Sequence, residues 1–381
     1  MPRRAASRGG CVLARHQLIL APAFGCTRGG RRPRERPGAV VPPDRLPSVP
    51  FGDLLGNADS VRWIRDALGA GRLGHALLLT GPDQVGKTTL LLAVAGELLP
   101  AGTWPGDLTT HPDLWLEDGD GERIGIERMR AGREPGSLQE FLSLRAYAGG
   151  ARAAIIARAE RLTEPAANSL LKTVEEPPPG SHILLTAENP ERLPDTIVSR
   201  CQRLSLGPVP PDAIEGWLRD RHGISEVTAA LAVELSAGRP GRALRLAGDP
   251  AALSAELASL DRFLAAGGGG TPAALSAAAE LAPGPGAEGR RRLLLNLAVW
   301  ASFVRDAALH AAGAPEMARW RSRSAALERW SETLPLDRSS VILDSLLKAS
   351  SDAAANAHPR LLLEALFLDI FGGSPSPPRT T

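Results

Sequence analysis

The spacing of apolar residues divides the chain into two parts that differ in predicted secondary structure. In the first part, from Pro50 to about Leu206, short apolar runs typical of buried strands alternate with segments of helical periodicity. The predicted strands are His75–Thr80, Arg152–Ala157 and Ser181–Thr186, and the predicted helices are Ser60–Ala70, Thr88–Leu99 and Glu164–Glu175. Ser60 is the expected cap of the first helix. Because strands that alternate with helices form parallel sheets, we expect an α/β module whose sheet is covered on both faces.

The second part, beyond Pro208, has helical periodicity without strand signals. Its predicted helices are Asp212–His222, Ser225–Ser236, Gly241–Leu246, Pro272–Leu281, Glu288–Ala312, Ala325–Leu334, Arg338–Ser350 and Pro359–Phe371. Gly267–Gly270 is typical of a linker. Amphipathic helices bury their apolar faces against one another, so this part predicts a small helical domain followed by an all-α C-terminal domain.

The overall composition is that of a globular protein. Of 381 residues, 43% are hydrophobic and 23% are charged, which is typical of folded domains, and the length predicts two or three of them. No apolar run approaches the roughly 20 residues that a membrane-spanning helix needs. Cys11, Cys26 and Cys201 are too widely spaced for a disulfide framework or a zinc cluster. We therefore expect a cytoplasmic protein without zinc and without a membrane partner.

The formal net charge of +2 hides an asymmetry between the two ends of the chain. Residues 1–50 contain ten arginines against Glu35 and Asp44, about +8, so the remainder carries about −6. That remainder is not expected to bind nucleic acid strongly by itself. Residues 1–47 are also rich in Gly and Pro, and we interpret them as a disordered extension. A transit peptide and a nucleic-acid-binding arm are alternative interpretations of the same composition.

One segment carries a complete phosphate-loop motif, GxxxxGK[ST]. Its residues, with the threonine that follows, are Gly81, Pro82, Asp83, Gln84, Val85, Gly86, Lys87, Thr88 and Thr89. The motif follows a predicted strand and opens a predicted helix, where backbone N–H groups can bind the phosphates of ATP. We expect Lys87 to contact the β- and γ-phosphates and Thr88 to face Mg²⁺. The alternative is an ordinary glycine-rich turn, but Lys87 is one of three lysines in the chain, which favours nucleotide binding.

The residues needed for hydrolysis are missing beside this motif. ATPases of this type place an acidic residue at the end of a neighbouring apolar strand to hold Mg²⁺, and a second acidic residue to orient water. The candidate strand, Ala153–Ile156, is followed by Ala157 and Arg158, and Glu160 lies past the expected position. We therefore expect no metal ligands from this strand and no hydrolysis. ATP binding stays open, because the loss of Mg²⁺ support costs affinity.

Several short runs, in this order along the chain, resemble the AAA+ family of bacterial clamp-loader subunits. They are Arg72–Leu79, His111–Leu114, Ile124–Glu127, Phe141–Tyr147, Ala166–Pro178, Ser199–Cys201, Gly238–Leu244 and Asn356–Glu364. The most specific of them is Ala166–Pro178. The resemblance covers about residues 48–372 and leaves both tails unexplained.

The resemblance implies three domains within residues 48–372, and the composition predicts disordered tails at 1–47 and 373–381. These domains are an AAA+ P-loop module at 48–207, a helical lid at 208–250 and a helical collar for oligomerisation at 251–372. The resemblance also implies that Arg200 is an arginine finger acting in trans, and that Arg242 contacts the nucleotide. The implied partners are gamma/tau and delta clamp-loader subunits in a hetero-oligomer, with the sliding clamp and primed DNA reached through the complex.

Two departures from the family pattern distinguish among its branches. The ATP-hydrolysing gamma/tau subunits carry a four-Cys zinc knuckle, whereas Leu99–Thr110 contains no Cys. They also carry an Asp-Glu pair where this chain has Ala157 and Arg158. Loss of that pair with Ser199–Cys201 retained is typical of the delta-prime branch, a stator within the DNA polymerase III holoenzyme.

Two other functional classes remain as alternatives. An active AAA+ ATPase of the gamma/tau type is disfavoured by the missing acidic pair. A small-molecule P-loop kinase needs an acceptor-substrate pocket with a basic lid, and the helical last third of the sequence offers no candidate for it.

Overall fold

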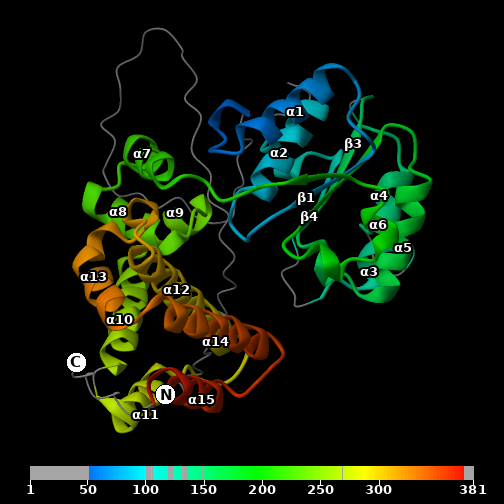
Figure 1. Ribbon diagram of the computed structural model, residues 1–381. Helices are drawn as coiled ribbons and strands as arrows, with labels where there is room; N and C mark the ends of the chain where they lie inside the picture. Colours follow the sequence, from blue (N-terminus) through cyan, green and yellow to red (C-terminus); the bar gives the residue numbers. More distant parts are fainter. Residues whose placement is uncertain are drawn as a thin grey trace, which may run out of the picture. The chain divides into compact units, whose positions relative to one another are not determined.

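The computed structural model describes residues 51–372 except 100–103, 105, 119–122, 131, 133–135, 148 and 268. The predictions for residues 1–47 and 373–381 lie outside the described residues. The chain divides into two compact units between Pro208 and Val209, and each unit is described by itself (Figure 1).

The first unit is built on a five-stranded sheet in which all neighbouring strands are parallel. The strands are β1 Ala76–Thr80, β2 Leu114–Glu117, β3 Arg152–Ile156, β4 Ser181–Ala187 and β5 Gln202–Ser205. Their order across the sheet is β2-β3-β4-β1-β5. Strand β1, which lies between β4 and β5, is buried along its whole length, which is why its sequence is continuously apolar. The prediction of a parallel α/β module is therefore confirmed.

Helices cover both faces of the sheet, as the sequence predicts (Figure 1). Alternate residues of β1 face opposite sides, with Leu77 in one apolar core and Leu78 in the other. The first core is closed by α1 Ala58–Gly69 and α2 Lys87–Leu98, and the second by α3 Ile126–Met129, α4 Leu138–Ser143, α5 Glu164–Glu175 and α6 Asp195–Val198. Short 3-10 turns lie at Phe51–Asp53, Leu108–Thr110, Ala159–Arg161 and Pro190–Arg192.

The prediction that Ser60 caps the first helix is wrong. Helix α1 begins at Ala58, so Ser60 lies within its first turn. Asn57 precedes the helix in a left-handed conformation with φ 51°, which asparagine tolerates. Its side chain accepts a hydrogen bond from the Gly207 N–H (2.8 Å) and donates one to the Gly207 carbonyl (3.1 Å). The helix therefore begins directly after Asn57, whose side chain is hydrogen-bonded to the segment that follows β5.

The second unit is entirely helical in its described residues. Its helices are α7 Pro211–His222, α8 Glu226–Ser236, α9 Pro240–Gly248, α10 Pro250–Ala266, α11 Gly270–Leu281, α12 Ala287–Ala311, α13 Ser324–Thr333, α14 Leu336–Ala354 and α15 Pro359–Phe371, with 3-10 turns at Pro315–Met317 and Arg321–Arg323. Sequence periodicity did not predict α10. Its buried stripe includes Leu253, Leu260 and Phe263 but also Glu256, and this charged residue interrupts the apolar pattern.

An aromatic cluster forms the centre of this unit. The ring of Phe263 stacks on Trp300 with centroids 4.9 Å apart, and Phe367 meets both rings edge-on. The fully buried Asp306 carboxylate accepts hydrogen bonds from the backbone N–H groups of Arg319 and Trp320, which joins α12 to the segment before α13. The prediction of helices with buried apolar faces is confirmed, whereas the division into lid 208–250 and collar 251–372 stays a prediction.

Candidate functional site

The phosphate loop connects the carboxyl end of β1 to the first residue of α2, Lys87. Gly81 has φ 137° and Gly86 has φ 109°, values that favour glycine. A Cβ atom on Gly81 would lie 2.2 Å from the Leu206 carbonyl oxygen, so a larger residue does not fit there. The strand–loop–helix context predicted from the motif is therefore confirmed, and the first N–H groups of α2 face the loop.

The Lys87 side chain folds back over this loop. Its Nζ donates hydrogen bonds to the carbonyl oxygens of Gly81 and Pro82, each at 2.7 Å, and the residue is 8% exposed. Burial is the main reason that the pKa of Lys87 is lowered, and the Arg158 charge lowers it further. The carboxylates of nearby acidic residues oppose this shift; they belong to Asp83, Glu188 and Glu160. A phosphate would give the ammonium a stronger, charged partner than these carbonyls.

The carboxyl end of β3 carries no acidic side chain. Ala157 is buried, and Arg158 follows it in a left-handed conformation with φ 55°. The Arg158 N–H donates a 2.9 Å hydrogen bond to the Thr186 hydroxyl on β4. Glu160 lies in the next turn, where one carboxylate oxygen accepts from the Glu188 N–H at 3.2 Å. Among the described residues, no group of three or more His, Cys, Asp or Glu side chains is arranged to hold a metal ion.

Arg200 lies at the amino ends of the strands, whereas the phosphate loop lies at their carboxyl ends. Strand β5 starts at Gln202 beside Leu77 and runs parallel to β1 until Ser205 lies beside Thr80. Arg200 therefore precedes the amino ends of these strands, whereas the loop follows their carboxyl ends. The paired residues alone span about 10 Å.

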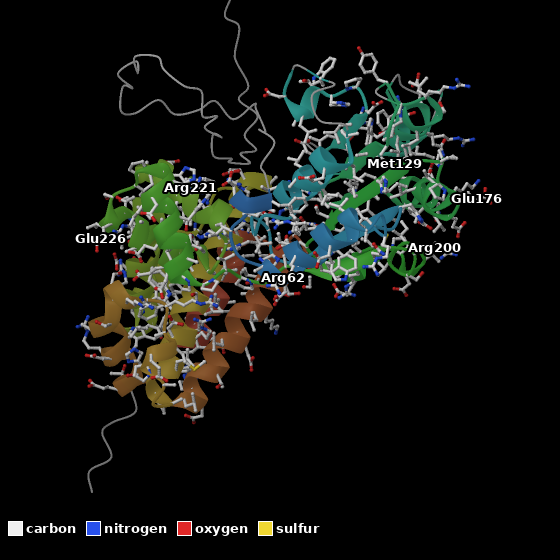
Figure 2. The ribbon with its side chains drawn as sticks, turned by 90° about the horizontal axis from the view of Figure 1, so that it is seen from above. Arg62, Met129, Glu176, Arg200, Arg221 and Glu226 are labelled. Carbon is white, nitrogen blue, oxygen red and sulfur yellow. The ribbon has the colours of Figure 1, made fainter. Side chains whose placement is uncertain are left out.

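The Arg200 guanidinium is available at the surface. Its side chain is 41% exposed, pairs with Glu175 at 2.8 Å and donates to the Thr196 carbonyl at 3.0 Å. Figure 2 shows it at the rim of the first unit, near Glu176. The neighbouring Cys201 packs against the apolar core, and burial raises the pKa of its thiol to about 11. The packing of Cys201 thus fixes the backbone next to Arg200, whose guanidinium is exposed.

Arg242 lies in the second unit, on α9, and is 1% exposed. One of its nitrogens pairs with the Glu256 carboxylate on α10 at 2.6 Å, while its Nε and Nη1 have no partner in the structure as described. Burial lowers the pKa of Arg242 to about 10, although Glu256 opposes the shift. The guanidinium therefore joins α9 to α10, and its predicted contact with the nucleotide stays a prediction.

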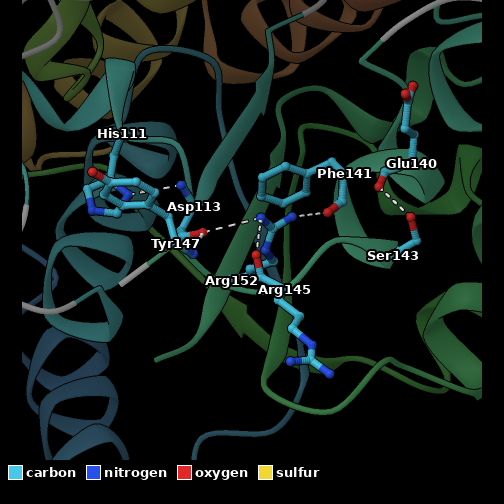
Figure 3. Close-up of polar contacts among 8 residues, drawn as sticks. All are labelled: His111, Asp113, Glu140, Phe141, Ser143, Arg145, Tyr147 and Arg152. Carbon is cyan, nitrogen blue, oxygen red and sulfur yellow. Dashed lines mark hydrogen bonds and ion pairs between the residues drawn. The ribbon is translucent and has the colours of Figure 1, made fainter. Parts of the chain in front are cut away.

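Sequence reasoning missed a buried polar network at the amino end of β3 (Figure 3). The Arg152 guanidinium donates to the carbonyl oxygens of Phe141 and Arg145, and it lies 3.4 Å from the Asp113 carboxylate. Asp113, fully buried, also accepts the Tyr147 N–H at 2.8 Å. Two runs that carry the family resemblance, His111–Leu114 and Phe141–Tyr147, thus meet here. The one sequence signal for the network is a charged residue at the start of an apolar strand.

Comparison with known proteins identifies relatives of part of the chain. Residues 56–210 match the sequence family described as DNA polymerase III, delta subunit. DNA polymerase III subunit delta-prime from Escherichia coli strain K12 is 35% identical over 191 residues, which are 46% of this chain and 55% of that protein. The Bacillus subtilis subunit delta-prime is 39% identical over 158 residues, covering 39% and 46% respectively. The chain spans about half the length of these curated relatives.

A solved structure of a DNA polymerase III gamma subunit-related protein from Thermotoga maritima aligns with a TM-score of 0.42 and 19% identity, covering 81% of this chain and 98% of that one.

Within the described residues, none of the helices has the length and apolar character needed to cross a membrane. Residues 56–210 of this chain are thus similar to the DNA polymerase III clamp-loader family and to its delta-prime subunits, which confirms the resemblance drawn from the sequence motifs over this part of the chain.

Proposed function

We propose that this chain is a delta-prime-like stator of the bacterial DNA polymerase III clamp loader, acting in the cytoplasm during DNA replication. In this role it assembles with gamma/tau and delta subunits into a complex that loads the sliding clamp on primed DNA. Its Arg200 completes the ATP site of an adjacent gamma/tau subunit, and its own phosphate loop binds ATP without hydrolysing it.

The observation that carries this proposal is the separation of Arg200 from the phosphate loop of its own chain. The two features lie at opposite ends of the paired strands β1 and β5, so the guanidinium cannot serve its own site. An exposed arginine at this edge can instead enter the site of a neighbour. There its planar, multi-donor group would stabilise the charge that develops on the transferred phosphate.

The cost of releasing Arg200 from its present partner is small. An ion pair between two partly exposed side chains, such as Arg200 and Glu175, contributes about 0–1 kcal/mol. An arginine finger changes the rate at the site it serves by about 10³–10⁵. The guanidinium can therefore exchange Glu175 for a phosphate without a large loss of stability.

The substitutions at the end of β3 support a passive site in this chain. Neither Ala157 nor Arg158 can hold Mg²⁺ or orient the attacking water, although the phosphate cradle around Lys87 is complete. This observation disfavours the alternative of an active ATPase of the gamma/tau type.

A three-domain organisation fits this function. The boundary between Pro208 and Val209 agrees with the end of an AAA+ module at residue 207, followed by a lid at 208–250 and a collar at 251–372. Apolar side chains exposed on α14 and α15 support the collar as a surface for partner subunits; they are Leu336, Val341, Leu347, Leu361 and Leu368.

Reconstitution tests the proposal. The chain is mixed with gamma/tau and delta subunits, and the assembled complex is isolated and assayed for DNA- and clamp-stimulated ATP hydrolysis and for clamp loading. We expect this chain to enter the complex and to raise both activities above those of gamma/tau and delta alone. Failure to assemble, or ATP turnover by this chain in isolation, would refute the stator role.

A further inference from the structure

ATP-binding sites of this family imply a Mg²⁺ ion. The Thr88 hydroxyl of the motif offers one ligand, but the strand end beside the loop does not supply the carboxylates that hold the ion. The strand end that supplies metal-holding carboxylates in ATP-hydrolysing proteins carries Ala157, which has no ligand atom, and Arg158, which is a cation. Of the carboxylates nearby, that of Glu160 is bonded through one oxygen to the Glu188 N–H, and its other oxygen is buried without a hydrogen-bond partner. A single carboxylate oxygen does not make up the ligand set of a Mg²⁺ ion. No three of the acidic or metal-ligating side chains that the structure describes form a metal-binding group.

The register of the sheet brings Arg158 to the level of the phosphate loop. Ile156 of β3 pairs with Leu185 of β4, and the chain then continues so that the Arg158 N–H bonds to Thr186. On the other side of β4, Ala187 pairs with Thr80, the residue before the loop. Arg158 therefore lies level with the end of β1, two strand spacings or about 10 Å away.

Cations gather at this end of the sheet. The Lys87 ammonium lies on the Gly81 and Pro82 carbonyls at the entrance to the loop. Arg158 is near enough to lower the pKa of Lys87 and also that of Arg161, although burial is the larger cause in both cases. In the part of the chain that the structure describes, the Arg158 guanidinium takes part in none of the side-chain hydrogen bonds or ion pairs.

The acidic residues nearby offset part of this charge without pairing with Arg158. Asp83, Glu160 and Glu188 all act on Lys87 in the opposite direction to Arg158. A polyphosphate bound in the loop would give both cations a direct partner.

We propose that the phosphate loop of this chain binds a nucleoside triphosphate without Mg²⁺, with the Arg158 guanidinium contacting the terminal phosphates in place of the metal. Arginine suits this role because its planar donors form paired hydrogen bonds with phosphate oxygens. The metal-free triphosphate also carries more negative charge than its magnesium complex, so it gains more from two protein cations. The inference rests on the proposed function, in which this loop binds ATP.

The test is equilibrium binding of a fluorescent ATP analogue to the full-length chain, in buffer with excess EDTA and in buffer with excess Mg²⁺. We expect the dissociation constant in EDTA to be equal to or lower than that in Mg²⁺. Arg158→Asn removes the cation with a residue that tolerates a left-handed backbone. It is expected to weaken binding in EDTA roughly ten- to a hundredfold, the effect of losing a charged hydrogen-bonding partner.

Two further variants control this measurement. Arg158→Lys keeps the charge and is expected to retain part of the affinity in EDTA. Arg192→Ala removes an exposed arginine from the 3-10 turn Pro190–Arg192 and is expected to leave binding unchanged in both buffers. Circular dichroism and melting temperature establish that each variant is folded.

The outcomes separate this inference from the proposed function. Binding that requires Mg²⁺ overturns the inference but leaves nucleotide binding intact. If Glu160→Gln then abolishes binding, that carboxylate holds the metal. Binding in EDTA that Arg158→Asn does not change overturns the role of Arg158. Absence of binding in both buffers overturns the inference together with the proposed nucleotide binding.

Discussion

Replacement of Arg152 by methionine is expected to destabilise the first unit strongly. Arg152 is 8% exposed and holds two carbonyl oxygens, those of Phe141 and Arg145, beside the fully buried Asp113. Methionine fills a similar volume but leaves the Asp113 carboxylate without its cation. Removing one partner of a buried ion pair costs about 3–5 kcal/mol, because the other charge stays buried.

Thermal and urea unfolding of the chain measure this effect. For a unit of this size, the loss corresponds to a fall in melting temperature of about 6–20 °C. Asp113→Asn in the same chain removes the buried negative charge and should recover part of the loss. Arg192→Ala, the exposed control, should leave the melting temperature within about 1–2 °C of the unchanged chain, since surface substitutions of this type usually change stability by less than about 0.5 kcal/mol. If Arg152→Met behaves like the control, the buried network does not stabilise this unit and the reasoning is refuted.

Three further predictions concern the phosphate loop and the N-terminal extension. Gly81→Ala should abolish binding of a fluorescent ATP analogue, because the alanine Cβ would overlap the Leu206 carbonyl and because the backbone angle φ of 137° at this position favours glycine. Binding at the original affinity would contradict this geometry. The isolated chain should hydrolyse radiolabelled ATP no faster than background, and Lys87→Ala should abolish analogue binding; turnover near 1 s⁻¹, within the range of about 1–10³ s⁻¹ typical of enzymes, would disprove the passive site. Deletion of residues 1–47 should leave the melting temperature and complex assembly unchanged, since that sequence offers little apolar surface to bury; loss of either property would mean that the segment packs on the rest of the chain.

Sequence patterns predicted the elements whose burial is uniform. Strands β1, β3 and β4 have continuous apolar runs because both faces are covered. Strands β2 and β5 have four residues each, and those of β5 are alternately half-buried and exposed, so no comparable run marks them. Helix α10 escaped prediction because its buried stripe contains Glu256, whose charge is matched by Arg242 on another helix. Such a pairing depends on tertiary contacts that periodicity does not contain.

Part of the candidate site could likewise be predicted from local sequence, and part depends on tertiary structure. The phosphate loop is a local motif, so its residues and its strand–loop–helix setting could be predicted from the sequence. Arg158 lies level with the loop because of the strand order β2-β3-β4-β1-β5. Arg200 lies at the amino ends of the strands because β5 pairs in parallel with β1. Strand order is set by packing between segments that are distant in the chain. The role proposed for Arg158 therefore required the sheet, whereas the family resemblance had already implied the role of Arg200.

Clamp loading by a complex that contains Arg200→Ala tests the central claim most directly. The variant should fold and assemble with gamma/tau and delta subunits, because the exposed Glu175 pair that it loses contributes little. Loading onto primed DNA should then slow markedly, with the bulk ATPase falling less because several sites share the assay. Arg200→Lys should restore little of the loading rate, since an ammonium lacks the planar donor fork. A complex that contains the control variant Arg192→Ala should load clamps as fast as the complex with the unmodified chain. Unchanged loading by an assembled Arg200→Ala complex would contradict the account and leave this residue as a solvated surface arginine.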